Sequence, residues 1–420
     1  MAPIAAVGLV LSFLFSSQRG RLSGLVHELP ERLGSIPPSV LTRLGERDVW
    51  WFHAASAGEV SGLAPLISTL SRKPEAPAIV VTSTTRSGRD AARALPGVAW
   101  AQLAPLDAWP CVSRFINRLV PSRLIVAETE IWPTALILAA KGGLSPALVN
   151  ARLTAQSLRR YRLISSILAP ALRGLTLVAV QTKEDSERFQ ALGIAPERIL
   201  VAGNSKYDQT CLPATNSAAR ARLSDLGWDE SPIFVAGSTH LPEEKILLAA
   251  FLNARQSLPT LRLVMAPRHL ERSDVAALLL TKAGLRLARW SEAGVPGRDA
   301  LLLDEMGVLS AFYPLSRAAF VGGTLVPVGG HNLLEPALAS VPVLFGPYTE
   351  HIDRPAKLLE MEGGGYRVQN EEELTAQVIR FCRDEFLSKV IGAQAKATAN
   401  RLQGASGRLL SALEDLPEGK

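Results

Sequence analysis

Carboxylate side chains follow two apolar segments of this chain at the points where strands would end. Ser56-Ala57-Gly58-Glu59 comes after the apolar run 49–55, and Glu128-Thr129-Glu130 comes after the run 124–127. The positive end of a helix favours Glu59, and a charge beside a buried strand is costly unless it is paired or serves a site. Glu59 and Glu128 are therefore candidates for acid–base chemistry. The alternatives are a helix cap for Glu59 and a cap or ion pair for Glu128.

A lysine follows a third apolar segment. Gly203-Asn204-Ser205-Lys206 comes directly after the strand predicted at 199–201. Gly and Asn tolerate unusual backbone angles, so Lys206 can project a point charge toward a site. The alternative is a solvated turn lysine paired with Asp208.

Three polar motifs occur in the second half of the chain: GSTH at 237–240, APRH at 266–269 and GGHNLLEP at 329–336. A Gly-Gly turn that leads into a helix presents N–H groups at a positive helix end, which suits a phosphate. Glu335 in the first helical turn could accept hydrogen bonds from ribose hydroxyls, and Arg268 could bind a phosphate or carboxylate with two N–H groups. The alternative for each motif is a cap followed by a tight turn.

The histidines and cysteines do not have metal-site spacing. No HxH, HxxxH or DxD pattern joins the histidines, and no P-loop or GxGxxG sequence follows a strand. We therefore expect no metal and no cofactor. The three cysteines lie far apart, which favours small buried side chains in a reducing compartment. They are Cys111, Cys211 and Cys382.

The charge balance and the N-terminus both point to an anionic surface. Lys and Arg total 45 against 39 Asp and Glu, a net charge of +6, which fits an anionic partner. No basic tract is interleaved with aromatic residues, so we expect no nucleic acid. Residues 2–15 are nearly all apolar and precede Arg19 and Arg21. This run is shorter than the ~20 residues of a membrane span, so we favour an interfacial anchor over a buried helix or a marginal span.

Strand-like apolar runs alternate with helical patterns along most of the chain. This alternation predicts an α/β fold with doubly wound parallel sheets. The alternation is interrupted around 207–232 by Pro, Thr, Asn and Gly. We therefore predict a membrane-associating segment at 1–20, a Rossmann-like domain at 21–212, a linker at 213–230 and a second Rossmann-like domain at 231–420. A ligand is expected in a cleft between the two domains, at the carboxyl ends of the strands.

Taken in order, these motifs resemble those of the 3-deoxy-D-manno-octulosonic acid (Kdo) transferases of lipopolysaccharide synthesis. The resemblance runs from about His53 to His351 and includes HAASAGE, LAPLD, ETEIWP, NARL, GNSKYD, GSTH, APRH and GGHNLLEP. It implies a GT-B fold, with the acceptor bound by the N-terminal domain and the CMP-sugar by the C-terminal domain. The apolar N-terminus is similar to the family's membrane-associating segment, which implies attachment to the cytoplasmic face of the inner membrane.

The resemblance also implies roles for individual residues. Glu59 matches the general base, and Glu128 and Lys206 match positions that stabilise the transition state. Residues matching the CMP-binding segments are Pro267, Arg268, Met306, Gly307, Val308, Asn332, Leu333, Leu334 and Glu335. Val308 stands where the family often has an acidic residue. A backbone contact to the nucleotide would tolerate valine, whereas a side-chain contact would be lost.

The implied reaction is transfer of Kdo from CMP-Kdo to a lipid A precursor (lipid IVA), with inversion at the anomeric carbon. Domain closure would exclude water from the reacting sugar. One alternative is another GT-B sugar-nucleotide enzyme, a UDP-sugar transferase or an epimerase, which differs in donor and base. A second alternative is a two-lobed periplasmic binding protein, which requires an export signal that this N-terminus does not resemble.

Overall fold

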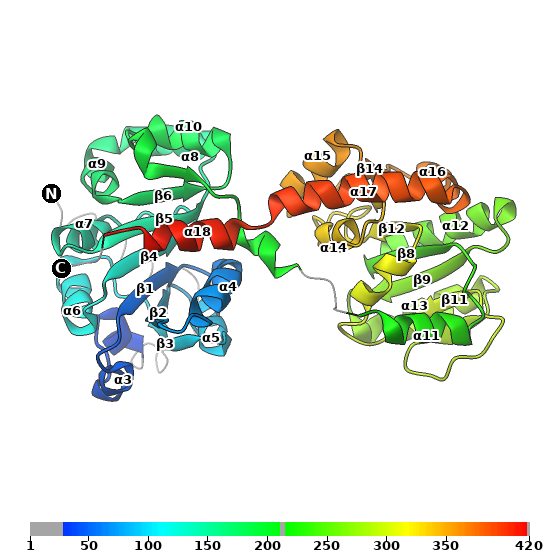
Figure 1. The fold of residues 1–420 in the computed structure, drawn as a ribbon, viewed down its shortest axis with the longest axis horizontal. Helices are drawn as coiled ribbons and strands as arrows, with labels where there is room; N and C mark the ends of the chain where they lie inside the picture. Colours follow the sequence, from blue (N-terminus) through cyan, green and yellow to red (C-terminus); the bar gives the residue numbers. More distant parts are fainter. Residues whose placement is uncertain (1–27, 211–214, 418–420) are drawn as a thin grey trace, which may run out of the picture. The chain divides into compact units, whose positions relative to one another are not determined.

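The computed structural model describes residues 28–210 and 215–417, which form two units (Figure 1). Of the described residues, 28–209 and 403–417 form the first unit, and 210 and 215–402 form the second. The predicted membrane-associating segment lies outside the described residues. Within the described part of the chain, no helix has the length and apolarity needed to cross a bilayer.

The first unit is built on a seven-stranded parallel sheet with the order β3-β2-β1-β4-β5-β6-β7. Its central strands are continuous apolar runs, as expected of strands covered on both faces. The strands are β1 (Val49–Ala54), β2 (Ala78–Ser83), β3 (Val98–Leu103), β4 (Arg123–Ala127), β5 (Ser145–Ala151), β6 (Leu177–Val180) and β7 (Ile199–Val201).

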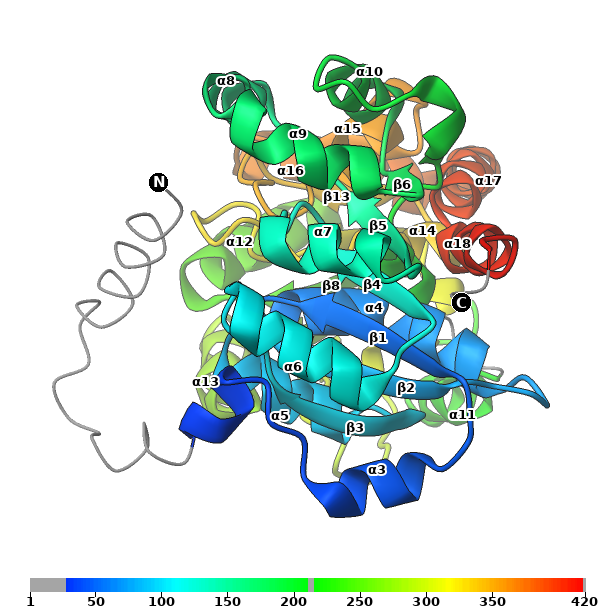
Figure 2. The ribbon, with the colours of Figure 1, turned by 90° about the vertical axis from the view of Figure 1, so that its left-hand side faces the viewer.

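Helices cover both faces of this sheet (Figure 2). They are α3 (Pro38–Leu44), α4 (Ala57–Ser71), α5 (Arg86–Ala94), α6 (Trp109–Leu119), α7 (Pro133–Lys141), α8 (Ala155–Leu163), α9 (Ser165–Gly174), α10 (Lys183–Gln190) and α18 (Ala405–Glu414). Side chains alternate between the faces along each strand. Trp51 packs in the core beneath α6, α7 and α9, whereas its neighbours Trp50 and Phe52 pack in the core beneath α4, α5 and α18.

The second unit contains another seven-stranded parallel sheet, with the order β10-β11-β9-β8-β12-β13-β14. Its strands are β8 (Ile233–Thr239), β9 (Arg262–Pro267), β10 (Leu287–Arg289), β11 (Ala300–Leu302), β12 (Ala318–Val321), β13 (Val343–Phe345) and β14 (Gly365–Arg367). Its helices are α11 (Ser217–Asp225), α12 (Leu241–Ser257), α13 (Ser273–Lys282), α14 (Leu334–Leu338), α15 (Asp353–Met361), α16 (Glu371–Arg383) and α17 (Glu385–Leu402). The α/β prediction with two Rossmann-like units is confirmed.

The predicted domain boundaries differ from the structure in two places. The expected linker at 213–230 contains α11, whose Ala219 and Leu223 are buried in the core of the second unit. The expected second domain at 231–420 runs too far, because α18 packs on α4 in the first unit. The return of α18 to the first unit cannot be predicted from the sequence, because a helix with one apolar face can pack on the sheet of either unit.

Three strands were absent from the sequence prediction. They are β3, β10 and β14. β10 and β14 are three residues long and each ends in arginine, so neither forms an apolar run. β3 has a half-exposed first half. The helix predicted after the Gly-Gly turn begins at Leu334, so Glu335 lies in its first turn and Asn332 precedes it.

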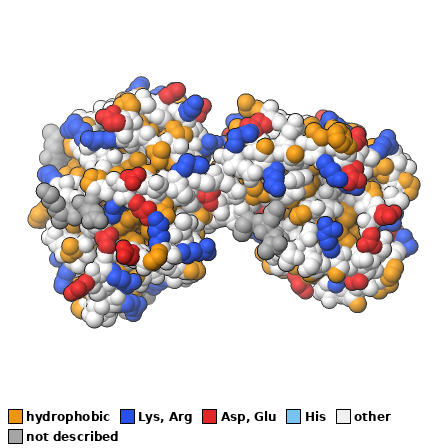
Figure 3. Space-filling view, in the orientation of Figure 1, with side chains coloured by type: hydrophobic (Ala, Val, Ile, Leu, Met, Phe, Trp, Pro, Cys, Tyr) orange, Lys and Arg blue, Asp and Glu red, His pale blue; other side chains and the backbone are white. Residues whose placement is uncertain are grey.

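Charged side chains of both signs are spread over the visible face of each unit (Figure 3). This distribution is the ordinary one for a soluble surface. The net charge of +6 therefore says little about any one site until particular segments are considered.

The return of α18 to the first unit gives a stability prediction. Leu409 of α18 is fully buried against the first sheet, whereas Leu163 at the end of α8 is 85% exposed. Leu409→Ala should lower the free energy of unfolding by about 2–5 kcal/mol. The matched control, Leu163→Ala, should change it by less than about 0.5 kcal/mol. Urea denaturation of the full chain checks both, and equal effects would contradict the packing of α18.

Candidate active site

Glu59 and Glu128 follow neighbouring strands at the point where the first sheet reverses its order. β1 pairs with β2 on one side and with β4 on the other, so the chain leaves β1 and β4 in opposite directions. Ligands of doubly wound sheets bind at the carboxyl ends of the strands beside such a switch point. The structure therefore brings the two sequence-predicted carboxylates to the position where this fold binds ligands.

Glu59 lies in the first turn of α4 and takes part in its cap. Its carboxylate accepts hydrogen bonds from the backbone N–H of Ala55 at 2.7 Å and from the hydroxyl of Ser56 at 2.9 Å. Ser56 Oγ in turn accepts from the Glu59 N–H at 3.3 Å. The cap considered from the sequence is thus present. It also fixes the carboxylate at the edge of the sheet, so that capping and chemistry are compatible.

The surroundings of Glu59 favour its protonated form. Burial raises the pKa of this carboxyl above its ordinary value of 4.5, and the hydrogen bonds from Ala55 and Ser56 oppose the rise. The negative charges of Glu128 and Glu130 add to the increase. A carboxylate with a raised pKa is a stronger base when ionised, which is the property that proton abstraction needs.

Glu128 has an unusual backbone conformation. Its φ of 53° lies in the left-handed region, which costs energy in a residue with a side chain. Its N–H donates to the carbonyl of Val149 in the next strand at 2.8 Å. On extended backbone, Glu128 and Glu130 would point the same way. The chain instead turns at Glu128.

Two cations lie near the Glu128 carboxylate. Burial raises the pKa of Glu128, while the positive charges of Arg152 and Lys206 lower it and Glu130 raises it. Lys206 and Glu128, both predicted as site residues, are therefore close enough to interact. The sequence analysis missed Arg152. It follows β5, which neighbours β4, so strand adjacency was the signal that could have identified it.

Lys206 is held beside the carboxylates by a short 3-10 helix, η2 (Ser205–Gln209). The buried hydroxyl of Ser205 donates to the Gly62 carbonyl of α4 at 2.6 Å. Asn150, at the end of β5, accepts from the Ser205 N–H at 3.0 Å and donates to its hydroxyl at 2.8 Å. These bonds join β5, α4 and η2. They explain how a residue after β7, at the edge of the sheet, reaches the residues that follow β1 and β4.

The alternative role for Lys206, a pair with Asp208, is wrong. The Asp208 carboxylate accepts from the N–H groups of Gly404 and Ser406, at 2.7 and 2.6 Å, where the chain enters α18. Asp208 therefore fastens the returning C-terminal segment. The Lys206 side chain interacts electrostatically with Glu128.

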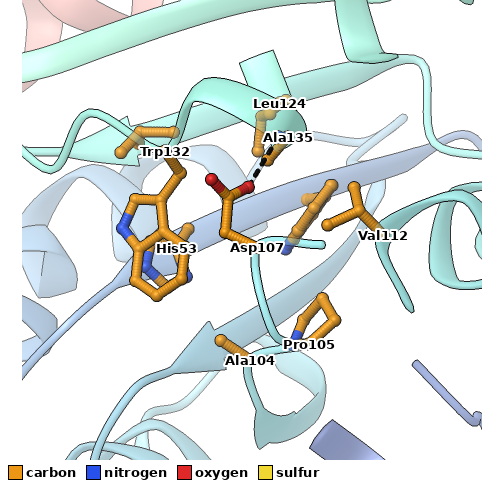
Figure 4. Close-up of a pocket in the computed structure, with 10 residues that line it drawn as sticks. His53, Ala104, Pro105, Asp107, Val112, Leu124, Trp132 and Ala135 are labelled. Carbon is orange, nitrogen blue, oxygen red and sulfur yellow. Dashed lines mark hydrogen bonds between the residues drawn. The ribbon is translucent and has the colours of Figure 1, made fainter. Parts of the chain in front are cut away.

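The first unit contains a small cavity of about 20 Å³ between His53, Asp107 and Trp132 (Figure 4). Asp107 accepts from the N–H groups of Thr134 and Ala135 at 3.1 and 2.8 Å. It therefore caps α7 and positions the loop that carries Glu128. His53 is buried, and burial, together with the charge of Arg32, lowers its pKa to about 4. The sequence analysis did not assign the capping role to Asp107.

The second unit has a switch point of its own, between β8 and β12. The GSTH motif ends β8 and begins α12, APRH ends β9, and GGHNLLEP follows β12. Since these strands are neighbours, the three polar motifs share one edge of the sheet. The structure thus brings together the motifs predicted to bind an anionic ligand.

The individual residues of this edge differ in exposure. The Pro267 ring is buried at the end of β9, and Arg268 is exposed. Asn332 is exposed: its amide donates to Thr210 Oγ1 at 2.9 Å and to Glu335 at 3.2 Å, and its oxygen accepts from the Leu334 N–H at 3.0 Å. Leu333 and Leu334 are buried, so their side chains anchor the segment. Burial raises the pKa of Glu335, and the bond from Asn332 opposes the rise.

The segment 306–308 forms a turn. Met306 is 67% exposed, and Gly307 has a φ of 84°, which favours glycine. Val308 packs against a hydrophobic cluster of the second unit that includes Phe312. The Val308 side chain therefore packs in the core, so a ligand could contact this residue only through its backbone.

A histidine cluster that the sequence analysis did not assign lies at the same edge. The Nε2 atoms of His240 and His331 are 2.9 Å apart, and their rings are stacked at 7°. His269 packs edge-on against His240 at 5.6 Å. Burial, followed by the charges of His240, Arg268 and neighbouring histidines, lowers the pKa of His331 to about 4. The pair is therefore neutral at pH 7, and a bound anion would favour its protonation.

Buried carboxylates fix the loops around this cluster. Glu243, in the first turn of α12, accepts from the N–H groups of His240 at 2.9 Å, Gly323 at 2.7 Å and Leu325 at 3.2 Å. It joins the end of β8 to the loop after β12. The His-x-x-Glu spacing of a capping box was the sequence signal for this role. The described residues contain no group of three or more side chains arranged to hold a metal.

Comparison with known proteins identifies the family. A family model described as 3-deoxy-D-manno-octulosonic-acid transferase (kdotransferase) matches residues 27–209. A 3-deoxy-D-manno-octulosonic acid transferase of Haemophilus influenzae is 34% identical over 320 residues, 74% of each chain. One of Bordetella pertussis is 31% identical over 377 residues, 87% of this chain and 86% of the other.

Among solved structures, a UDP-GlcNAc 2-epimerase from Neisseria meningitidis superposes with a TM-score of 0.56. The match covers 88% of this chain and 100% of the epimerase, at 12% identity. A likeness at this identity shows the fold, a GT-B-like pair of parallel α/β units, and says nothing of the reaction. The reaction class follows from the close sequence relatives: this chain belongs to the family of 3-deoxy-D-manno-octulosonic acid transferases.

Proposed function

We propose that this chain transfers Kdo from CMP-Kdo to a hydroxyl of a lipid A precursor (lipid IVA), with inversion at the anomeric carbon. The proposal combines the membership of the transferase family with one observation in the structure. That observation is the meeting of Glu59, Glu128 and Lys206 at the switch point of the first sheet.

Glu59 is the proposed general base. The acceptor hydroxyl has a high pKa, so its proton has to leave as the oxygen attacks the anomeric carbon. The fixed cap geometry holds the Glu59 carboxylate in one place, and its raised pKa increases its basicity. One displacement assisted by one base gives inversion, since the acceptor attacks the face opposite to the departing CMP.

Glu128 and Lys206 are proposed to stabilise the transition state. The reacting sugar acquires positive, oxocarbenium-like charge as the bond to phosphate breaks, and an ionised Glu128 would stabilise that charge. Lys206 and Arg152 lower the pKa of Glu128 and so help to keep it ionised. Lys206 can also bind the carboxylate of the acidic sugar.

The second unit is proposed to bind CMP-Kdo through its polar edge. Arg268 is exposed there and can bind the phosphate or the sugar carboxylate with two N–H groups. Helix α14 has only five residues, and the Leu334 N–H already donates to Asn332. The helix end predicted from the sequence is therefore a weaker phosphate site than Arg268. Glu335, beside Asn332, is the candidate to accept from the ribose hydroxyls, and the backbone of 306–308 is the candidate to contact the base. No metal or cofactor takes part in these steps.

We further propose that the protein works at the cytoplasmic face of the inner membrane, where a lipid A precursor is embedded. The apolar segment 2–15 followed by Arg19 and Arg21 supports this location. The acceptor is a lipid, so the enzyme has to reach a membrane surface during each reaction.

The second candidate function is that of a GT-B enzyme acting on a UDP-sugar, which the fold likeness to the epimerase favours. The two candidates differ in the nucleotide bound. CMP at about 100 times its Kd should stabilise the second unit by about 2.7 kcal/mol, a shift of several degrees in Tm, whereas UMP and UDP should have little effect. A larger shift with UDP than with CMP would favour the epimerase-like alternative.

Replacement of the proposed base gives a direct prediction. Glu59→Gln keeps the size of the side chain and one of its two acceptor oxygens but removes its basicity. Transfer from CMP-Kdo should fall by about 10²–10⁴-fold, while CMP binding is unchanged. The matched control is Glu75→Gln, at an exposed residue of the first unit, which should leave transfer unchanged. Turnover within threefold of the original in the Glu59 variant would remove Glu59 from this role.

The charge of Lys206 gives a prediction for the pH dependence. Lys206 lowers the pKa of Glu128, so Lys206→Gln should raise that pKa. Because Glu128 works in its ionised form, the acidic limb of the transfer rate against pH should move to higher pH. Lys206→Arg keeps the charge and should leave the limb near its original position. Identical limbs in the Gln and Arg variants would show that the charge of Lys206 does not act on Glu128.

The histidine pair gives a prediction for proton uptake. His240 and His331 have lowered pKa values and are neutral at pH 7, whereas a bound dianionic phosphate would raise their pKa. Binding of CMP at pH 6 should therefore take up protons. Calorimetry in buffers of different ionisation enthalpy measures this uptake. His331→Asn should reduce the uptake, and an undiminished uptake would exclude the pair as its source.

A further inference from the structure

The turn between α8 and α9 exposes large apolar side chains to solvent. Leu163 is 85% exposed, Ile167 65% and Ile164 43%. The opposite side of these helices is well packed: Leu168 and Leu172 are buried in the first core, and Leu158 packs against it. Exposed apolar side chains gathered in one turn mark an interaction surface more often than scattered ones do.

Arginines surround these apolar side chains. Arg159, Arg160 and Arg162 of α8 are exposed, and within the described residues none of them forms an ion pair with a carboxylate. The sequence from Ile131 to Lys183 contains no Asp or Glu. Since charges of both signs are spread over the visible face of each unit (Figure 3), this stretch is unusual in carrying only one sign. Three exposed aliphatic side chains among three unpaired arginines are typical of interfacial helices that bind anionic lipids.

The surface lies next to the proposed catalytic carboxylates. On the inner side of α8, the hydroxyl of Tyr161 donates to the backbone oxygen of Thr129 at 3.5 Å, and Thr129 stands between Glu128 and Glu130. The pKa of Tyr161 is raised by burial and by the charge of Glu130. Figures 1 and 2 show α8 and α9 at the β6 side of the first sheet. One helix thus contacts the catalytic loop on one side and presents the apolar turn on the other.

We propose that the α8–α9 surface, formed by Arg159, Arg160, Arg162, Leu163, Ile164 and Ile167, docks directly on an anionic phospholipid bilayer. The aliphatic side chains enter the level of the headgroups, and the arginines bind lipid phosphates. This contact is separate from attachment by the N-terminal segment. It places the Glu128 loop next to the headgroup layer, where the sugar of a lipid-linked acceptor lies; this last step rests on the proposed function.

A probe attached to the surface tests the contact independently of other attachment points. In a full chain with Cys211→Ser, a polarity-sensitive fluorophore is attached to Leu163→Cys or, as a matched control, to Phe386→Cys. Phe386 is 77% exposed in the second unit, and the remaining cysteines, Cys111 and Cys382, are buried.

With vesicles of phosphatidylglycerol, the probe at position 163 should shift its emission to shorter wavelength, and the probe at 386 should not. Vesicles of pure phosphatidylcholine should give a much smaller shift at 163. The absence of a shift at 163 on phosphatidylglycerol would overturn the proposal. This holds even if the protein sediments with the vesicles, because the chain would then be attached through another segment. Equal shifts at 163 and 386 would also overturn it.

Charge and apolar variants test the same surface by vesicle sedimentation. Arg159→Gln/Arg160→Gln/Arg162→Gln should reduce partitioning onto phosphatidylglycerol by about tenfold or more at low salt, and Leu163→Ser/Ile167→Ser should also reduce it. Lys282→Gln/Arg383→Gln/Lys396→Gln, at exposed residues of the second unit, removes the same charge and should have a smaller effect. Equal losses of vesicle partitioning in the two triple variants would show that binding depends only on the net charge of the protein. That result would contradict docking by the α8–α9 surface. No donor or acceptor is present, so these outcomes do not depend on the proposed reaction.

Discussion

The energetic constraint on this protein is the placement of Glu59 and Glu128 at the ends of two buried neighbouring strands. Burial raises the pKa of both. The charges of Glu128 and Glu130 raise the pKa of Glu59 further, and the charge of Glu130 raises the pKa of Glu128. A carboxyl whose pKa is higher in the folded than in the unfolded state lowers stability as pH rises through 4.5 toward the folded value. Stability is therefore lost at neutral pH, and the rest of the first unit offsets this loss.

The surrounding structure is organised to hold the carboxylates in place. Ser56 and Ala55 fix Glu59, and Asp107 caps the helix that follows the Glu128 loop. Asn150 and Ser205 bring Lys206 back from the far edge of the sheet. The residues that do the proposed chemistry are few, whereas those that position them come from the ends of β1, β3, β5 and β7. A similar arrangement recurs in the second unit, where Glu243 holds the loops around the histidine pair.

Much of this could be predicted from the sequence, since continuous apolar runs identify parallel strands and polar motifs after those runs identify the binding edge. The bounds of β7, the strand predicted at 199–201, match the structure to the residue. The return of α18 could not be predicted, because an amphipathic helix does not specify which sheet it covers. The pairing of His240 with His331 could not be predicted either, because the two residues are 91 positions apart and the sequence around each gives no sign of their contact. The left-handed backbone at Glu128 was missed for a related reason: it depends on a hydrogen bond to β5.

The central claim is that Glu59 lies in a desolvated site and interacts with the charge of Glu128. The most direct measurement is the pKa of the Glu59 carboxyl, obtained from the pH titration of its ¹³C resonance or its infrared carboxyl band, assigned by comparison with Glu59→Gln. The account predicts a pKa above 4.5 that falls when Glu128 is replaced by glutamine. A pKa at or below 4.5, unchanged by that replacement, would contradict it.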